Sequence, residues 1–213
     1  NASSSAIARS VTVSAAVVTP SAYTKISNTG ATLPDTAVLG SGSNDWACTK
    51  DNKTGLTWEV KTDDGGLRDK DWRYSWYEPD SSKNGGFAGY TDTPNIKPNC
   101  STKDNCNTYA FTNAVNTKGL CGKKDWRMPT VDELKTLVYC SDGNYQIDGS
   151  CTNYSSVANP TINSKYFLNT LSNLYWSSSP DAYGSSGAWY VNFSGSNSDY
   201  GSKDYYGFVQ LVR

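Results

Sequence analysis

The sequence predicts an α+β fold in which two short helices lie among short antiparallel strands and long loops. Two stretches, 108–118 and 131–139, carry apolar residues at helical spacing. Most of the remaining chain alternates between aromatic or β-branched stretches and turns rich in glycine, asparagine and aspartate. The 6 cysteines include no Cys-x-x-Cys pair, and the chain has no histidine, so disulfides are favoured over a zinc site.

The N-terminal half has three stretches with the composition of strands: 22–27, 45–50 and 55–61. The last two flank a turn at 51–54, which indicates a hairpin. Leu56, Trp58 and Val60 alternate along the second strand and therefore share one face. Residues 67–104 show no steady period, and their many aromatic side chains predict a packed, irregular excursion.

The stretch 119–134 ends one predicted helix and begins the next. Gly119 is suited to the end of the first helix because glycine adopts a left-handed conformation without steric cost. Thr130 and Glu133 have the spacing of a capping box at the start of the second helix. Thr108 is expected to cap the first helix.

Three β-rich segments are expected towards the C-terminus, at 174–178, 188–193 and 205–213. Gly195 and Gly201 punctuate the predicted connection between the last two. Two short helices among short strands, with a final strand at the C-terminus, favour a C-type-lectin-like domain with long disulfide-tethered loops.

The run at 120–134 reads Leu-Cys-Gly-x-x-Asp-Trp-Arg-Met-Pro-Thr-x-x-Glu-Leu. It resembles the domain family typified by the C-terminal domain of the Legionella collagen-like adhesin (Lcl). The resemblance extends, in the same order, to 51–60, 175–179 and 209–213, and so covers roughly residues 46–213. It implies a secreted or surface-displayed adhesin that binds sulfated or acidic polysaccharides such as glycosaminoglycans, in host-cell attachment or biofilm formation.

The cysteine positions allow many pairings, and free buried thiols are the alternative to disulfides. The expected pairs are Cys106–Cys121, Cys140–Cys151 and Cys48–Cys100. The first would bracket the first helix, the second would close a polar loop, and the third is what remains. Disulfides predict an oxidising compartment outside the cytoplasm.

Residues 1–20 differ from residues 21–213, which are expected to form the lectin-like domain. The first segment is rich in serine, alanine and valine and has no aromatic residue. Its coiled-coil-like core positions are Ile7, Val11, Ser14 and Val18. A strand fits the segment equally well. We expect a neck that pairs with its own copies, and a linker or a segment lying on its own domain is the alternative. The family resemblance favours a homotrimer at the end of a collagen-like stalk.

The start of the chain has no apolar run long enough for a signal peptide or a membrane span, so no membrane insertion is expected. Because the sequence begins at Asn1 rather than at a methionine, it is expected to be a piece of a longer secreted protein.

The composition argues against an enzyme. Without histidine, the chain has no Ser-His-Asp triad and no Cys-His pair. The element at 127–133 also resembles one in the formylglycine-generating enzymes, which use a cysteine pair late in the chain. No cysteine follows Cys151, so that alternative is disfavoured and no catalytic residue is expected.

Calcium is the cofactor that the sequence could support. Its oxygen-rich positions are Asp63, Asp64, Asp69, Asp71, Asp199 and Asp204. Their spacing is not that of an EF-hand, and the Glu-Pro-Asn and Trp-Asn-Asp triplets of sugar-binding lectins are missing. Solvated turn aspartates are therefore favoured, and no cofactor is expected.

The formal net charge is −1, so the molecule as a whole does not attract polyanions, and no binding of nucleic acid is expected. Any anion-binding site would have to come from a local cluster of cations. The candidate residues are Lys118, Lys123, Lys124 and Arg127, then Arg68, Lys70 and Arg73, and finally Lys97 and Lys103. Lysine and arginine form charge-assisted hydrogen bonds with sulfate and carboxylate groups. One copy would bind weakly, and three copies in a trimer would gain avidity.

Several of these cations also have a plainer interpretation. Arg127 is expected to be half-buried and structural, between Trp126 and Met128. Lys123 and Lys124 are either binding residues or solubilising charges. Arg68 and Arg73 have aspartates nearby with which they could pair.

A second way to bind glycans would use exposed aromatic rings. The candidates are Tyr183, Trp189, Tyr200, Tyr205 and Tyr206. The alternative function needs no ligand: the domain would only cap an upstream trimeric fibre and align its chains. Surface lysines would then be dispensable.

Overall fold

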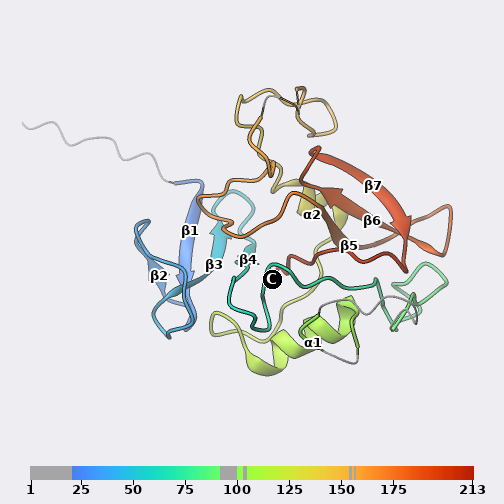
Figure 1. The fold of residues 1–213 in the computed structure, drawn as a ribbon, viewed down its shortest axis with the longest axis horizontal. Helices are drawn as coiled ribbons and strands as arrows, with labels where there is room; N and C mark the ends of the chain where they lie inside the picture. The colour runs from blue at the N-terminus through green and yellow to red at the C-terminus, as the bar shows by residue number, and fades with distance from the viewer. Residues whose placement is uncertain (1–20, 92–99, 103–104, 154, 156) are drawn as a thin grey trace, which may run out of the picture.

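The computed structural model describes residues 21–91, 100–102, 105–153, 155 and 157–213. Within these residues the chain forms two antiparallel sheets, two helices and long loops (Figure 1). The elements are β1 (Tyr23–Ser27), β2 (Thr32–Leu33), β3 (Trp46–Asp51), β4 (Thr57–Glu59), α1 (Thr108–Lys118), α2 (Val131–Lys135), β5 (Leu174–Pro180), β6 (Gly187–Asn192) and β7 (Asn197–Ser202). The predicted neck, with Ile7, Val11, Ser14 and Val18, lies outside the described residues, as do Lys97 and Lys103.

The two sheets lie on either side of the C-terminal segment, residues 205–213 (Figure 1). One sheet has the order β2-β1-β3-β4, and the other has the order β5-β6-β7. Val212 bridges to Trp58 of β4, and Phe208 bridges to Tyr175 of β5. The prediction of short helices among antiparallel strands is thus confirmed in its general form.

The C-terminal segment is not the strand that its composition predicts. Its residues form single bridges with four different segments, at Tyr74, Tyr175, Trp58 and Arg127, instead of pairing along one neighbour. Its side chains are buried in two different directions. Phe208 and Val212 enter the core around α2 and β5, and Val209 and Leu211 enter the core around α1 and β3. The segment therefore joins the two cores.

The helix boundaries follow the local signals, with two corrections. Asn107, rather than Thr108, caps α1, because its side chain accepts a hydrogen bond from the Ala110 N–H at 2.8 Å. The predicted capping box of α2 is present, with Thr130 and Glu133 bonded in both directions. That helix ends at Lys135, earlier than expected, although the following turn still buries apolar side chains.

Strand β7 is a further correction, since residues 197–202 were expected to be a loop. All six of its residues pair with β6, from Asn192↔Asn197 to Gly187↔Ser202. None of its side chains is fully buried. An edge strand of this kind is held by backbone hydrogen bonds to its neighbour. It does not require alternating apolar residues, so its sequence does not identify it as a strand.

The disulfides are Cys48–Cys121, Cys100–Cys106 and Cys140–Cys151. Only the last agrees with the prediction, and the expected pairs Cys106–Cys121 and Cys48–Cys100 are wrong. The reason is geometric. The 11-residue helix α1 separates Cys106 from Cys121, and its length of about 16 Å exceeds the Cα separation of about 7 Å that a disulfide spans. Cys106 instead pairs with the nearby Cys100.

Candidate functional site

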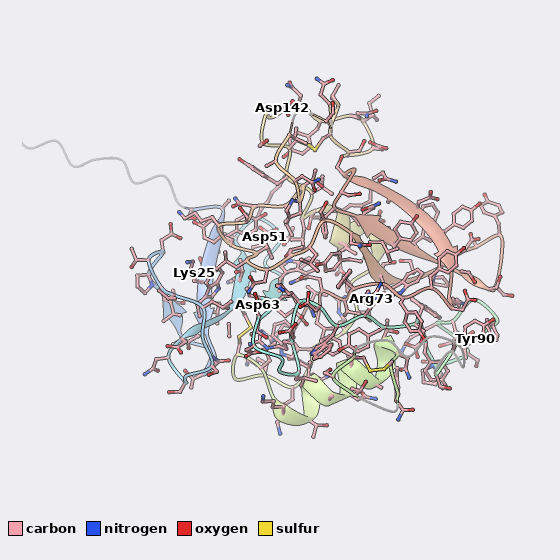
Figure 2. All side chains as sticks on the ribbon, viewed as in Figure 1. Lys25, Asp51, Asp63, Arg73, Tyr90 and Asp142 are labelled. Atoms are coloured by element: carbon pink, nitrogen blue, oxygen red, sulfur yellow. A yellow bond between two sulfur atoms is a disulfide. The ribbon has the colours of Figure 1, made fainter. Side chains whose placement is uncertain are left out.

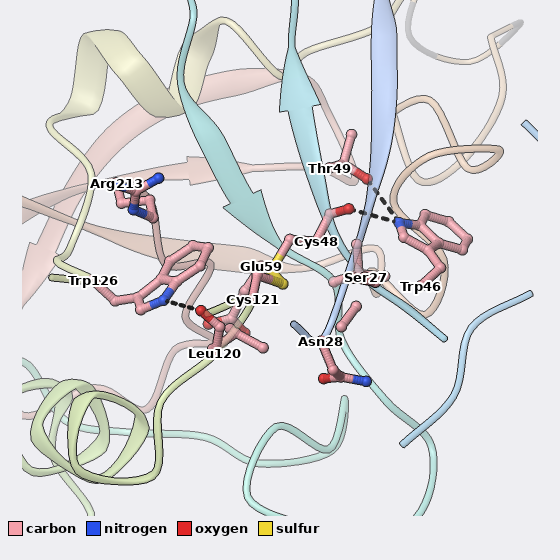
Figure 3. The surroundings of a disulfide bond; sticks show 12 residues. Ser27, Asn28, Trp46, Cys48, Thr49, Glu59, Leu120, Cys121, Trp126 and Arg213 are labelled. Carbon is pink, nitrogen blue, oxygen red and sulfur yellow. Dashed lines mark hydrogen bonds between the residues drawn. A yellow bond between two sulfur atoms is a disulfide. The ribbon is translucent and has the colours of Figure 1, made fainter. Parts of the chain in front are cut away.

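The connection between α1 and α2 is held against the first sheet by the Cys48–Cys121 disulfide (Figure 3). Next to this bond, Leu120 and Lys123 exchange backbone hydrogen bonds of 2.9 and 3.0 Å and form a tight turn. The Gly122 N–H donates to the Asn28 carbonyl at 3.1 Å. Gly122 has a φ of +70°, and a side chain there would meet the Thr29 carbonyl oxygen at 2.6 Å. The turn is therefore fixed in place.

A surface hollow of about 300 Å³ lies beside this disulfide. We call it the basic hollow, and its cations are Lys50, Lys123 and Arg213. They come from β3, the tight turn and the C-terminal segment. Ile26, Thr32, Thr57 and Cys121 also line the hollow. Three segments that are far apart in sequence thus bring three positive side chains to one depression.

The disulfide explains why two of these lysines meet. Lys50 lies two residues after Cys48 on β3, and alternate residues of a strand share one face. Lys123 lies two residues after Cys121 in the tight turn. Bonding the two sulfur atoms therefore places both lysines on the same side of β3. Sequence analysis missed Lys50 and Arg213, and the correct cysteine pairing was the signal that would have found Lys50.

Arg213 is held from two sides. Its backbone N–H and carbonyl bond to Thr57 at 2.9 and 3.0 Å, and its Nε donates to Asp125 Oδ1 at 2.9 Å. This hydrogen bond lowers the pKa of the Asp125 carboxyl. Lys50 and Lys123 are exposed and form no ion pair within the described part of the chain. The basic hollow thus retains two unpaired cations.

The other two candidate lysines of the connection lie elsewhere. Lys118 lines a separate hollow of about 120 Å³, together with Asp64 and Arg68. Lys124 is exposed but does not line the basic hollow. The predicted cluster of neighbouring lysines is therefore divided between two surfaces.

Arg127 has the structural role that was expected. Its Nη1 and Nη2 atoms each donate to a Glu133 carboxylate oxygen at 2.7 Å, and 48% of its side chain remains exposed. The ion pair lowers the pKa of Glu133 and raises that of Arg127. Because Glu133 also completes the capping box, Arg127 stabilises the start of α2.

The second predicted cluster does not form one anion-binding surface. Arg68 donates from Nη1 to the carbonyls of Ala47 and Val60, and burial lowers its pKa. The alternative, pairing of Arg68 with nearby aspartates, is also wrong, because its hydrogen bonds go to the backbone. Lys70 lies between Asp63 and Asp71, with its Nζ at 3.1 and 3.0 Å from their carboxylates.

Arg73 is exposed and lies apart from Asp63, as the labels in Figure 2 show.

The aspartates of the same loop form the densest group of carboxylates in the described residues. Oxygens of Asp63, Asp69 and Asp71 lie within 4.8 Å of one another. Asp69 accepts backbone N–H bonds from Asp64, Gly65 and Asp71 at 2.7 to 2.9 Å. Since Lys70 already bridges the two other carboxylates, the loop balances much of this charge with its own groups.

The late aromatic residues belong to the second sheet and its loops, whereas the basic hollow is lined by the first sheet, the tight turn and the C-terminal segment. Tyr183, Tyr200 and Tyr205 are exposed, and Trp189 and Tyr206 are partly exposed. Trp189 of β6 and Tyr200 of β7 pack edge to face with their ring centroids 5.7 Å apart.

Residues 47–213 match the family model described as the Lcl C-terminal domain. No match was found among curated proteins or among solved structures. The family resemblance seen in the sequence is confirmed, and it supports an adhesin-related extracellular domain of a non-enzymatic type. The C-type-lectin-like fold stays a prediction. Within the described residues, no helix has the length and apolar character needed to cross a membrane.

Proposed function

We propose that this chain, which belongs to the Lcl C-terminal domain family, is an adhesive domain that binds sulfated or acidic polysaccharides through the basic hollow. The observation that carries the proposal is the convergence of Lys50, Lys123 and Arg213 at one depression. Sulfate and carboxylate groups accept charge-assisted hydrogen bonds from lysine and arginine. Every cation of the hollow lies within the residues that match the family.

The exposure of these cations sets the expected strength of binding. A contact between exposed charges is worth about 0.5–1 kcal/mol, so three contacts on one copy bind a sugar segment only weakly. A long polysaccharide can engage several copies at once, and linking the sites raises the overall affinity by orders of magnitude. We therefore include in the proposal a homotrimer displayed at the bacterial surface, acting in host-cell attachment or biofilm formation.

The test is binding to immobilised heparin at increasing salt concentration. Lys50→Ala combined with Lys123→Ala is compared with Lys83→Ala combined with Lys165→Ala. The control removes the same charge from two exposed lysines that pair with Asp80 and Asp35. The first variant is expected to lose at least about fivefold in affinity, because two contacts of 0.5–1 kcal/mol are removed. The control is expected to stay near wild type, and wild-type binding is expected to weaken steeply with salt.

Equal losses in both variants would show that only net charge matters and would contradict a located site. The alternative function, a cap of a collagen-like fibre without ligand, predicts no heparin binding in any variant.

A gain-of-function variant sharpens the test. Asp125 holds the Arg213 guanidinium with contacts of 2.9 and 3.2 Å. Asp125→Asn removes the competing negative charge and leaves the shape of the side chain nearly unchanged. Heparin affinity is expected to rise about two- to fivefold, since one exposed charge interaction is released. An unchanged or weaker affinity would place Arg213 outside the site.

A further inference from the structure

A second hollow, of about 430 Å³, lies between one face of α1 and the connection to α2. We call it the tyrosine groove. The helix contributes Tyr109, Thr112, Asn113 and Asn116, which follow the spacing that puts residues on one helical face. Tyr77 and Met128 line it from the opposite segments. The polar face of α1 thus faces a depression, and Phe111 and Val115 on its other face enter the core.

The walls of the groove are fixed. Asn116 clamps the connection, because its carboxamide donates to the Trp126 carbonyl and accepts from the Trp126 N–H, each at 2.8 Å. The following Pro129 carbonyl accepts a hydrogen bond of 2.6 Å from Ser178 of β5. A ligand would therefore meet a preformed surface and would not have to order it.

The two tyrosines give the groove its binding chemistry. The rings of Tyr77 and Tyr109 pack edge to face with their centroids 6.2 Å apart. The Tyr109 side chain is 44% exposed although it belongs to a well-packed helix. Beside it, Asn113 is exposed, and its carboxamide forms no hydrogen bond within the described residues. An aromatic ring and an amide with free donors and acceptors thus lie on adjacent turns.

The cationic side chains at the groove are already paired. Arg127 is bound to Glu133 at 2.7 Å, and Lys83 is bound to Asp80 at 3.0 Å. The third charged group, Glu78, accepts the Asp80 N–H at 2.9 Å. The groove therefore lacks the unpaired cations that distinguish the basic hollow, and it does not favour an anionic ligand.

We propose that the tyrosine groove binds an uncharged pyranose segment of a glycan, independently of the basic hollow. The apolar face of a sugar ring stacks on Tyr109, and its hydroxyl groups exchange hydrogen bonds with the Asn113 amide. A pocket of this volume, lined by aromatic side chains and a few polar groups, has the usual character of a small-ligand site. The domain would then contact a polysaccharide at two chemically different places.

The test titrates the whole chain with three neutral oligosaccharides, cellohexaose, maltohexaose and chitohexaose, and follows binding by calorimetry and by protein NMR. Wild type is compared with Tyr109→Ala and Asn113→Ala. The matched control is Tyr139→Ala, which removes an equally exposed tyrosine (41%) that does not line the groove. Both tyrosines are partly exposed and neither belongs to a buried core cluster, so the variants are expected to fold, which circular dichroism checks.

At least one of the three oligosaccharides is expected to bind with a dissociation constant of about 1 mM or tighter. Tyr109→Ala is expected to weaken that binding at least about fivefold, and Tyr139→Ala to leave it unchanged. The proposal is overturned if none of the three binds, or if Tyr109→Ala and Tyr139→Ala have equal effects. Binding of a polyproline peptide instead of the sugars would also overturn it, because such peptides dock in aromatic grooves. Heparin binding by the basic hollow is measured separately, so each proposal can fail alone.

Discussion

The buried and the exposed lysines of this chain behave as two different kinds of residue. Lys61 and Lys203 are 3% and 0% exposed; Lys61 pairs with Glu59, and Lys203 donates to three backbone carbonyls. Lys50 and Lys123 are exposed at the basic hollow and form no ion pair in the part of the chain that the structure describes. The buried ones hold segments together, and only the exposed ones are available to a ligand. The comparison shows that a lysine's function follows from its neighbours in space.

Lys203 illustrates the buried kind. Its Nζ donates to the carbonyls of Asn84, Phe87 and Ser185 at 2.6 to 2.8 Å and lies 4.3 Å from the centre of the Trp76 ring. It thereby ties the loop around residue 84 to the loop that precedes β6. Lys61 pairs with Glu59 at the end of β4 and lies over the Phe111 ring.

Breaking the buried pair is expected to have the largest effect. Lys61→Ala leaves the fully buried Glu59 carboxylate without its cation, which costs about 3–5 kcal/mol of unfolding free energy. Lys123→Ala, at the surface, is expected to change it by less than about 0.5 kcal/mol. Urea unfolding measures both. Similar values for the two variants would remove the distinction between the two kinds of lysine.

Removing a disulfide is expected to have the next largest effect on the free energy of unfolding. In the chain-entropy model, the Cys48–Cys121 bond, with a separation of 73 residues, contributes about 4 kcal/mol, and the Cys100–Cys106 bond, with a separation of 6, about 2 kcal/mol. Paired Cys→Ala variants of each bond, studied by thermal unfolding, test this order. Only loss of the first bond is expected to weaken heparin binding, because only that bond places Lys123 beside Lys50. Equal weakening in both variants would contradict this role.

Lys203→Met is expected to cost about 2–3 kcal/mol, because three buried carbonyls lose a charged donor. The effect should also depend on pH. Burial lowers the pKa of Lys203 from 10.5 to about 8. The unfolded chain therefore holds this proton more tightly between these values, so raising the pH from 8 to 10.5 should increase the unfolding free energy of the wild type relative to the variant. Urea titrations at several pH values would show a flat difference if Lys203 were solvated.

Arg127→Ala should have the smallest effect on stability, about 0.5–1 kcal/mol, since the ion pair with Glu133 is half exposed. The ion pair lowers the pKa of Glu133 from 4.5, so its contribution is present at neutral pH and is lost as the pH falls through the folded-state pKa. Chemical unfolding at neutral and acidic pH measures this. Heparin affinity is expected to stay the same, and a clear loss would return Arg127 to the binding residues.

The parts of the fold that could be predicted from the sequence are those with local causes. The bounds of α1, the capping box of α2 and the Cys140–Cys151 loop depend on residues close together in the chain. Strand β7 could not be predicted, because its pairing with β6 determines it. Trp58 and Val60 were predicted to share one face of a strand, and the structure buries Glu59 and Lys61 on the other face as well.

The candidate site was predicted only in part for the same reason. Lys123 was found because cations are dense around the tight turn. Lys50 and Arg213 are distant in sequence and reach the basic hollow only through the disulfide and the C-terminal segment. Arg68 was predicted to be a surface cation, but its guanidinium donates hydrogen bonds to two backbone carbonyls.

The most direct test of this account is the acetylation rate of each lysine, measured by mass spectrometry with and without a heparin oligosaccharide. Lys61 and Lys203 are expected to react slowly in both conditions. Lys50 and Lys123 are expected to react quickly alone and to be protected by the oligosaccharide, and Lys83 is expected to react quickly in both. Protection of Lys83 to the same degree as Lys50 and Lys123, or no protection of either hollow lysine, would contradict the account.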